Sequence, residues 1–215
     1  MDECKDKEPT KRILDAAASL FAQKGFAAVG VREIAKHANV NIAMISYYYN
    51  GKIGILKSII EEYFRELQII IKEVNCKQLS ASDGLREMVS SMVALMQRET
   101  DLCKVAILEL PFNIPEIEDF KIKMLIQHNR IVKDSFHSKK PVCEEPTQNV
   151  IIGPALTGLI FSNFIFGNLL TKAYNIKLDD QFYKTYSDTI STLFLRGIKG
   201  VVENAKEFQN IKKND

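Results

Sequence analysis

Apolar residues recur every three or four positions along most of this chain, which is the spacing that places them on one face of an α-helix. The longest such stripe consists of Leu56, Ile60, Tyr63, Leu67, Ile71 and Val74, and it predicts one helix over about 52–75. Similar patterns predict helices at about 10–24, 82–99, 101–110, 115–137, 148–173 and 179–202, with a loop at 138–147 and a frayed tail after 203. Gly and Pro are scarce, at 10 and 6 residues, which favours long helices over sheets. We therefore predict an all-α fold.

Two shorter helices, at about 31–38 and 42–48, flank the sequence HANVN. Asn39 stands where the chain must turn, and asparagine tolerates the left-handed backbone conformation nearly as well as glycine. Asn41 is a suitable N-cap for the second short helix. With the helix at 10–24 packed across their back, these elements predict a three-helix helix-turn-helix domain at 1–57, followed by a larger helical domain at 58–215.

The second short helix begins with residues suited to contacting DNA bases. Ile42, Ala43 and Met44 stand at its N-terminal end, which is the end that a recognition helix presents to base edges in the major groove. Small or unbranched side chains at this end let a helix sit deep in the groove. The alternative for Met44 is a place in the protein core.

Three consecutive tyrosines follow, and then a lysine. Tyr47 and Tyr48 could each donate a hydroxyl hydrogen bond to a DNA phosphate, although they could also be ordinary core aromatics. Lys52 is expected to open the next helix, where its ammonium and the backbone N–H groups both favour phosphate. Tyr49 lies one residue further round and is expected to pack inward.

Charge is uneven along the chain, whose net charge is only +2. Residues 9–60 hold seven basic and two acidic side chains, a balance of +5, whereas residues 61–215 hold 20 basic and 21 acidic side chains, a balance of −1. A basic segment before a neutral one indicates a polyanionic partner for the first segment alone. The alternative is an ordinary solvated helical surface.

Three segments together carry a resemblance to a known family: ILDAAASLFAQKGF, VREIAKHANV and YYYNGK, within about residues 10–57. They resemble the N-terminal domain of the TetR family of bacterial transcription regulators. The resemblance implies that the DNA-facing residues are Arg32, Ile42, Ala43, Met44, Tyr47, Tyr48 and Lys52. Arg32 could instead pair with Glu33 or solvent. The chain departs from the family pattern at Asn39, which replaces the usual turn glycine, at Gly30, which replaces a small hydroxyl residue, and at Ser46, where many members carry an aromatic residue.

Beyond residue 60 the resemblance extends only to architecture. It implies a helical ligand-binding domain that dimerises through its last two long helices, so that a homodimer binds a palindromic double-stranded operator and responds to a small effector. Methionines and phenylalanines are concentrated in this half, and such flexible thioethers and rings suit an adaptable apolar cavity, although for each one a plain core position is the alternative. The predicted cavity residues are Phe64, Met92, Met96, Phe120, Met124 and Phe164, with His128 and Asn163 as polar groups. In the last helix, a seam for a partner helix is predicted at Phe182, Tyr186, Ile190, Leu193 and Gly197.

Other functions find little support in the sequence. The segment 146–171 has no charged residue and is long enough to span a bilayer, but its interior contains Asn163 and Asn168, whose amides are costly in lipid. We find no motif for catalysis, phosphate binding, a metal or a cofactor. Cys4, Cys76, Cys103 and Cys143 match no zinc or redox spacing, and the charged N-terminus is unlike a secretory signal.

These observations predict a cytoplasmic transcription regulator that responds to a small, mostly apolar effector. In this family such a protein is most often a repressor, and it is neither an enzyme nor bound to a membrane. The alternatives are a membrane-anchored helical adaptor or enzyme, and a regulator that senses redox conditions through Cys76 or Cys103.

Overall fold

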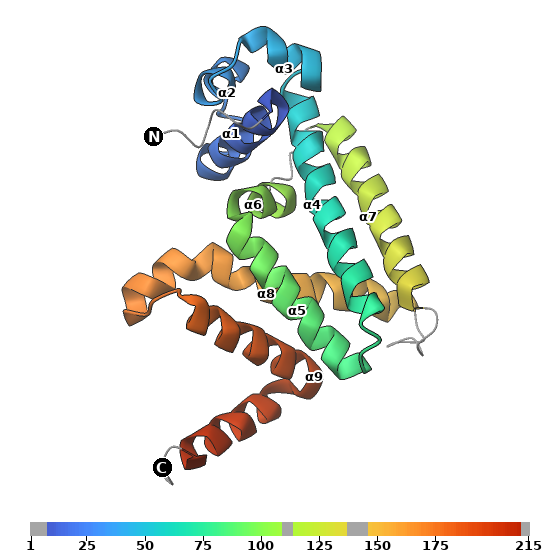
Figure 1. Ribbon diagram of the computed structural model, residues 1–215, viewed down its shortest axis with the longest axis vertical. Coiled ribbons are helices and arrows are strands. Elements are labelled where there is room, and N and C mark those ends of the chain that lie inside the picture. The colour runs from blue at the N-terminus through green and yellow to red at the C-terminus, as the bar shows by residue number, and fades with distance from the viewer. Residues whose placement is uncertain (1–7, 109–113, 137–145, 212–215) are drawn as a thin grey trace. The chain divides into compact units, whose positions relative to one another are not determined.

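The computed structural model describes residues 8–108, 114–136 and 146–211, and all regular secondary structure in these ranges is helical (Figure 1). The predicted all-α fold is therefore confirmed. The predicted loop falls mostly outside the described residues, since positions 137–145 are not among them and Pro146 already opens a helix. The helices are α1 (Pro9–Lys24), α2 (Val31–His37), α3 (Ile42–Tyr49), α4 (Lys52–Cys76), α5 (Ala81–Arg98), α6 (Thr100–Leu108), α7 (Pro115–Phe136), α8 (Pro146–Tyr174) and α9 (Asp180–Ile211).

The chain divides into two compact units. The first contains residues 1–69 and 99–134, and the second contains residues 70–98 and 135–215. Helix α4 contributes to both units, because the division falls after Ile69. These units do not follow the sequence division into domains at 1–57 and 58–215, which stays a prediction.

In the first unit, α1 packs against α2, α3 and α6. Ile13, Ile34 and Ile45, one from each of α1, α2 and α3, are all at most 1 % exposed. Full burial of such a side chain contributes roughly 1.5–3 kcal/mol relative to exposure. Phe21 and Phe26 pack edge to face, with ring centroids 5.2 Å apart, where α1 ends at Gly25. A shared apolar core thus fixes the three N-terminal helices.

Helices α4 and α7 also lie side by side in the first unit (Figure 1). Lys57 on α4 forms an ion pair with Glu116 on α7 at 2.5 Å. Further along, the ring of Phe64 lies 5.5 Å from that of His128. Burial lowers the pKa of His128, since desolvation disfavours the charged imidazolium.

In the second unit, α9 packs against α5 and α8, and α5 also packs against α8. The last helix, predicted at 179–202, is present as α9. It continues to Ile211, so the prediction of a frayed tail after 203 is wrong, and it is broken at Gly197, whose φ is 67°. Glycine adopts this left-handed conformation without the steric penalty that a Cβ atom would bring. Helix α9 bends accordingly (Figure 1).

Helix α8 confirms the predicted helix at 148–173, extends it slightly at both ends, and contains the uncharged segment 146–171. Across the described ranges, none of the helices is both long enough and apolar enough to cross a membrane.

Candidate DNA-binding surface

The turn between α2 and α3 is held by hydrogen bonds from two side chains, those of Arg12 and Asn41. The Arg12 guanidinium on α1 donates to the carbonyls of Ala38 at 3.4 Å and Asn39 at 3.2 Å. Asn39 has a φ of 54°, in the left-handed region that the sequence predicts for it. The Asn41 side chain accepts from the backbone N–H of Ala43 at 2.9 Å and so caps α3 as predicted. The orientation of α3 on α1 and α2 is therefore fixed at its N-terminus.

Within helix α3 only Ile45 is fully buried, Met44 and Tyr49 are partly buried, and the other residues are exposed. Ala43 is exposed and Met44 is partly buried, so the core alternative for Met44 is only partly met. Ile42 is 42 % exposed, a high value for a branched aliphatic side chain. The three residues predicted to meet base edges thus share the accessible N-terminal end of a capped helix.

The three tyrosines separate into an outward pair and an inward one. Tyr47 is 82 % exposed and Tyr48 is 43 % exposed, so the alternative that these two are core aromatics is wrong. Their rings meet edge to face, with centroids 4.9 Å apart. Tyr49 instead points inward as predicted, and its hydroxyl donates to the carbonyl of Thr10 at 2.7 Å. Burial raises the pKa of Tyr49 to about 12, and the negative charge of Asp15 adds to this shift.

The junction from α3 to α4 is tight. Asn50 and Gly51 both adopt left-handed conformations, with φ of 55° and 96°, and α4 begins at Lys52 as predicted. Gly54 passes so close to α3 that a Cβ atom there would lie 1.5 Å from the carbonyl oxygen of Tyr49. The Nζ atom of Lys52 lies 4.2 Å from the centre of the Phe26 ring and 3.5 Å from the carbonyl oxygen of Ala27. The sequence gives no signal that Phe26 would hold this ammonium.

Ion pairs neutralise part of the charge on the N-terminal helices. Lys24 binds Glu33 at 2.6 Å, and this hydrogen bond is the largest cause of the lowered pKa of Glu33. The alternative that Arg32 pairs with Glu33 is therefore wrong, and Arg32 is exposed. Both acidic side chains of residues 9–60 are engaged, because Lys11 binds Asp15 at 3.0 Å. The remaining positive charge near α3 suits a polyanion.

Comparison with known proteins identifies this arrangement. Residues 13–59 match the pattern described as "Bacterial regulatory proteins, tetR family", which covers the capped turn, the outward tyrosines and Lys52. The chain belongs to the TetR family. It is 23 % identical to the "Probable HTH-type transcriptional regulator YttP" of Bacillus subtilis, over 87 % of this chain and 92 % of the relative. It is 25 % identical to the "Fatty acid metabolism regulator protein" of the same organism, over 90 % and 98 %.

Among solved structures, the fold resembles that of the transcriptional regulator FadR from Bacillus subtilis in complex with stearoyl-CoA. The TM-score is 0.62 and the identity 22 %, over 87 % of this chain and 98 % of FadR. The protein is therefore a TetR-family transcriptional regulator with a larger C-terminal helical domain.

The eight predicted cavity residues of this TetR-family chain fall equally in the two units. In the first unit, Phe64 contacts His128, while Phe120 lies beneath the Lys57 ammonium, with Nζ 5.5 Å from its ring centre. Met124 is partly buried on the same helix, α7. These four residues therefore come from the neighbouring helices α4 and α7.

In the second unit, Met92, Met96 and Asn163 are buried, with exposed fractions of 8 %, 1 % and 4 %. Phe164 stacks on Tyr183, with ring centroids 5.5 Å apart. One cavity lined by all eight residues stays a prediction.

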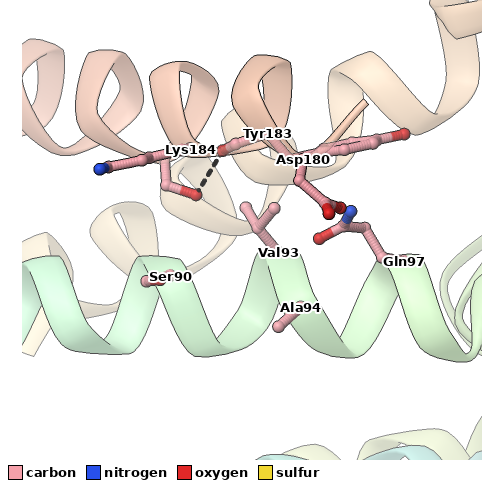
Figure 2. Close-up of a pocket in the computed structure, with 8 residues that line it drawn as sticks. Ser90, Val93, Ala94, Gln97, Asp180, Tyr183 and Lys184 are labelled. Carbon is pink, nitrogen blue, oxygen red and sulfur yellow. Dashed lines mark hydrogen bonds between the residues drawn. The ribbon is translucent and has the colours of Figure 1, made fainter. Parts of the chain in front are cut away.

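The second unit also contains a pocket of about 220 Å³ between α5 and α9 (Figure 2). Its lining comprises Ser90, Val93, Ala94, Gln97, Asp180, Tyr183, Lys184 and Ser187, and includes none of the eight predicted residues. Figure 2 shows the polar side chains of Asp180 and Lys184 on its α9 side. The Ser187 hydroxyl donates to the carbonyl of Tyr183 at 2.9 Å. The lining of this pocket mixes polar and apolar side chains, unlike the predicted apolar cavity.

Proposed function

We propose that this protein is a repressor that reads a palindromic operator with the outward surface of α3. Ile42, Ala43 and Met44 meet base edges, while Tyr47, Tyr48, Arg32 and Lys52 contact the phosphate backbone. The observation that carries this proposal is the exposure of Tyr47 on α3. This helix is capped by Asn41 and anchored in the core by Ile45. A tyrosine side chain this exposed contributes little to folding, whereas its hydroxyl is free to donate a hydrogen bond to a DNA phosphate.

Sequencing the DNA fragments that the pure protein retains tests this proposal. We expect one inverted repeat to be enriched, with half-sites about one DNA turn or a small multiple apart. Retention of DNA without a shared motif would mean that α3 does not read bases.

The acting species is a homodimer formed through α8 and α9. The support is an exposed apolar stripe on α8, where Ile165, Phe166 and Leu169 are 44 %, 51 % and 66 % exposed. Ile151, 62 % exposed, extends it toward the helix N-terminus. Contiguous exposed apolar surface of this kind is typical of a partner interface, and a permanent one buries on the order of 2,000 Å² or more.

The predicted α9 seam needs revision, because part of it is already used inside the protomer. Ile190 is only 6 % exposed, and Tyr186 bonds to α8. We therefore assign the larger share of the interface to α8. Phe166→Glu should shift the protein to monomer in sedimentation velocity at micromolar concentration. Gln127→Glu, which makes the same charge change on the exposed surface of α7, should leave the dimer intact. A dimer that survives Phe166→Glu would contradict this interface.

The effector carries a long acyl chain. Two relatives support this class: one is named for fatty acid metabolism, and the FadR structure contains stearoyl-CoA. Met92, Met96 and Phe164, all in the second unit, are apolar side chains of the kind that such a chain would contact. To act, the effector must favour one arrangement of the DNA-binding domains over another, because equal affinity for both would shift nothing.

A preference of ~1.4 kcal/mol lowers operator affinity only about tenfold, so useful induction requires ~3 kcal/mol. Acyl-CoA thioesters of increasing chain length should raise the melting temperature of the protein and release the operator in a gel-shift titration. Failure of every chain length in both measurements would remove acyl compounds as effectors and leave the DNA-binding proposal standing. Full burial disfavours a redox role for Cys103, whereas Cys76 is exposed and that alternative stays a prediction for it.

A further inference from the structure

Asn163, in the middle of α8, is a buried amide for which the described residues provide no hydrogen-bond acceptor. Its side chain is 4 % exposed, and its Nδ2 atom has no partner in the described part of the chain. Its neighbours along the helix, Ile160 and Phe161, are 0 % and 2 % exposed. Most buried polar groups are hydrogen-bonded, because an unpaired one carries the whole desolvation penalty. The donor at Asn163 therefore requires an explanation.

The backbone around Asn163 is fixed by Tyr186 from α9. The Tyr186 hydroxyl lies 2.6 Å from the carbonyl oxygen of Leu159 and 3.3 Å from the backbone nitrogen of Asn163. In a regular α-helix these two backbone groups bond to each other, so the hydroxyl lies at an ordinary helix hydrogen bond, donating to the carbonyl and accepting from the N–H. The Ser162 hydroxyl, 3.2 Å from that of Tyr186, completes the group.

This network engages the backbone of Asn163 and leaves its side-chain donor unused. Loss of local order does not explain the unpaired amide, because Tyr186 and Ser162 hold the same helical turn. An acceptor from a partner subunit bound to the exposed α8 stripe does not explain it either, because Asn163 is already buried within a single protomer. The donor is therefore available to an acceptor that the described residues do not supply.

We propose that Asn163 Nδ2 donates a hydrogen bond to a carbonyl oxygen of the acyl effector, and so selects acyl compounds over hydrocarbon chains of equal length. This inference rests on the proposed acyl effector. A carbonyl oxygen is a strong acceptor, and bound beside Ile160 and Phe161 it satisfies a donor that water cannot easily reach. A ligand that lacks the carbonyl leaves the amide unpaired, which is how a buried polar group rejects an analogue. Tyr186 is the positioning residue for this contact.

The test compares two ligands that differ only at the carbonyl: palmitoyl-CoA, a thioester, and S-hexadecyl-CoA, the corresponding thioether. The wild-type protein should bind the thioester about tenfold more tightly in calorimetry, as expected for one buried hydrogen bond. In Asn163→Leu this preference should disappear while the Kd for the thioether stays the same. The ligand-free variant should also melt at a higher temperature, because the unpaired amide is gone.

Controls separate a specific contact from a general disturbance. Asn75→Leu makes the same chemical change at a partly buried position of α4 and should keep the tenfold preference. Tyr186→Phe should reduce the thioester preference without abolishing thioether binding. If Asn163→Leu does not fold, Asn163→Ala replaces it, and the wild-type ratio alone remains decisive.

Equal wild-type affinity for the two ligands would overturn the role of Asn163. A variant that weakens both ligands by the same factor would overturn it too. If neither ligand binds the wild-type protein, the acyl effector itself is wrong and the inference falls with it.

Discussion

Tyr47 and Tyr49 are two residues apart on α3, yet the structure assigns their hydroxyls to different tasks. Tyr47 is 82 % exposed, whereas the Tyr49 hydroxyl donates to the carbonyl of Thr10 at 2.7 Å. Replacing each with phenylalanine removes one oxygen atom and keeps the ring. The two variants therefore control for each other.

Tyr47→Phe should leave the free energy of unfolding within ~0.5 kcal/mol of the wild-type value, as is usual for an exposed substitution. It should weaken DNA binding, because a hydrogen bond to a charged group contributes about 1.5–3 kcal/mol. A loss of 1.5 kcal/mol corresponds to roughly tenfold in Kd. The loss should be the same for all DNA sequences, and the salt dependence should not change, because no charge is removed.

Tyr49→Phe should show the opposite pattern. Losing a partly buried hydrogen bond should reduce the free energy of unfolding by about 1 kcal/mol and the melting temperature by about 2–4 °C. DNA affinity at a temperature where the protein is folded should change by less than about threefold. Urea unfolding and gel-shift titration measure both quantities. The reasoning is refuted if Tyr47→Phe binds DNA normally, or if Tyr49→Phe loses DNA affinity without losing stability.

Three further predictions follow from other parts of the fold. Gly54→Ala should destabilise the protein by ~3 kcal/mol in urea unfolding, because the new Cβ atom would lie 1.5 Å from the carbonyl oxygen of Tyr49. Gly84→Ala on α5 should be neutral or stabilising, because the new Cβ atom would lie 3.9 Å from its nearest neighbour. Lys52→Ala should weaken binding to all DNA sequences and reduce the salt dependence of DNA affinity by about one unit of log–log slope per subunit, whereas Lys177→Ala in the exposed segment after α8 should change neither. An unchanged slope in Lys52→Ala would exclude a phosphate contact at Lys52. Burial lowers the pKa of His128 in the folded protein, so as the pH falls the unfolded chain binds a proton at this residue first. The free energy of unfolding should therefore decline as the pH falls below 6.5, and the same decline in a His128→Gln variant would show that other groups cause it.

The sequence predicts the N-terminal helices well because their signals are local. Asn41 caps α3, Asn39 adopts the left-handed turn, and α4 begins at Lys52, each from a few neighbouring residues. The outward and inward tyrosines also follow from helical spacing, since a step of 100° per residue separates Tyr47 from Tyr49.

Features that depend on distant residues are not predicted. The Phe26 ring beneath Lys52 and the Arg12 bonds to the turn join residues about 26 positions apart, and no periodic pattern reveals such pairs. The break at Gly197 is missed for a different reason. A glycine is tolerated inside a helix, so its left-handed conformation depends on packing rather than on the residue alone. For the same reason, the division of the predicted cavity residues between two units was not visible in their spacing.

The central claim is that the outward surface of α3 reads DNA bases, and Met44 tests it most directly. DNA should be selected from a random pool by the wild-type protein and by Met44→Ala, and both selected pools sequenced. The account predicts one inverted repeat for the wild type. For the variant it predicts the same half-site spacing with altered base preference at symmetric positions in both half-sites. Identical preferences in the two pools, or no inverted repeat in either, would contradict it.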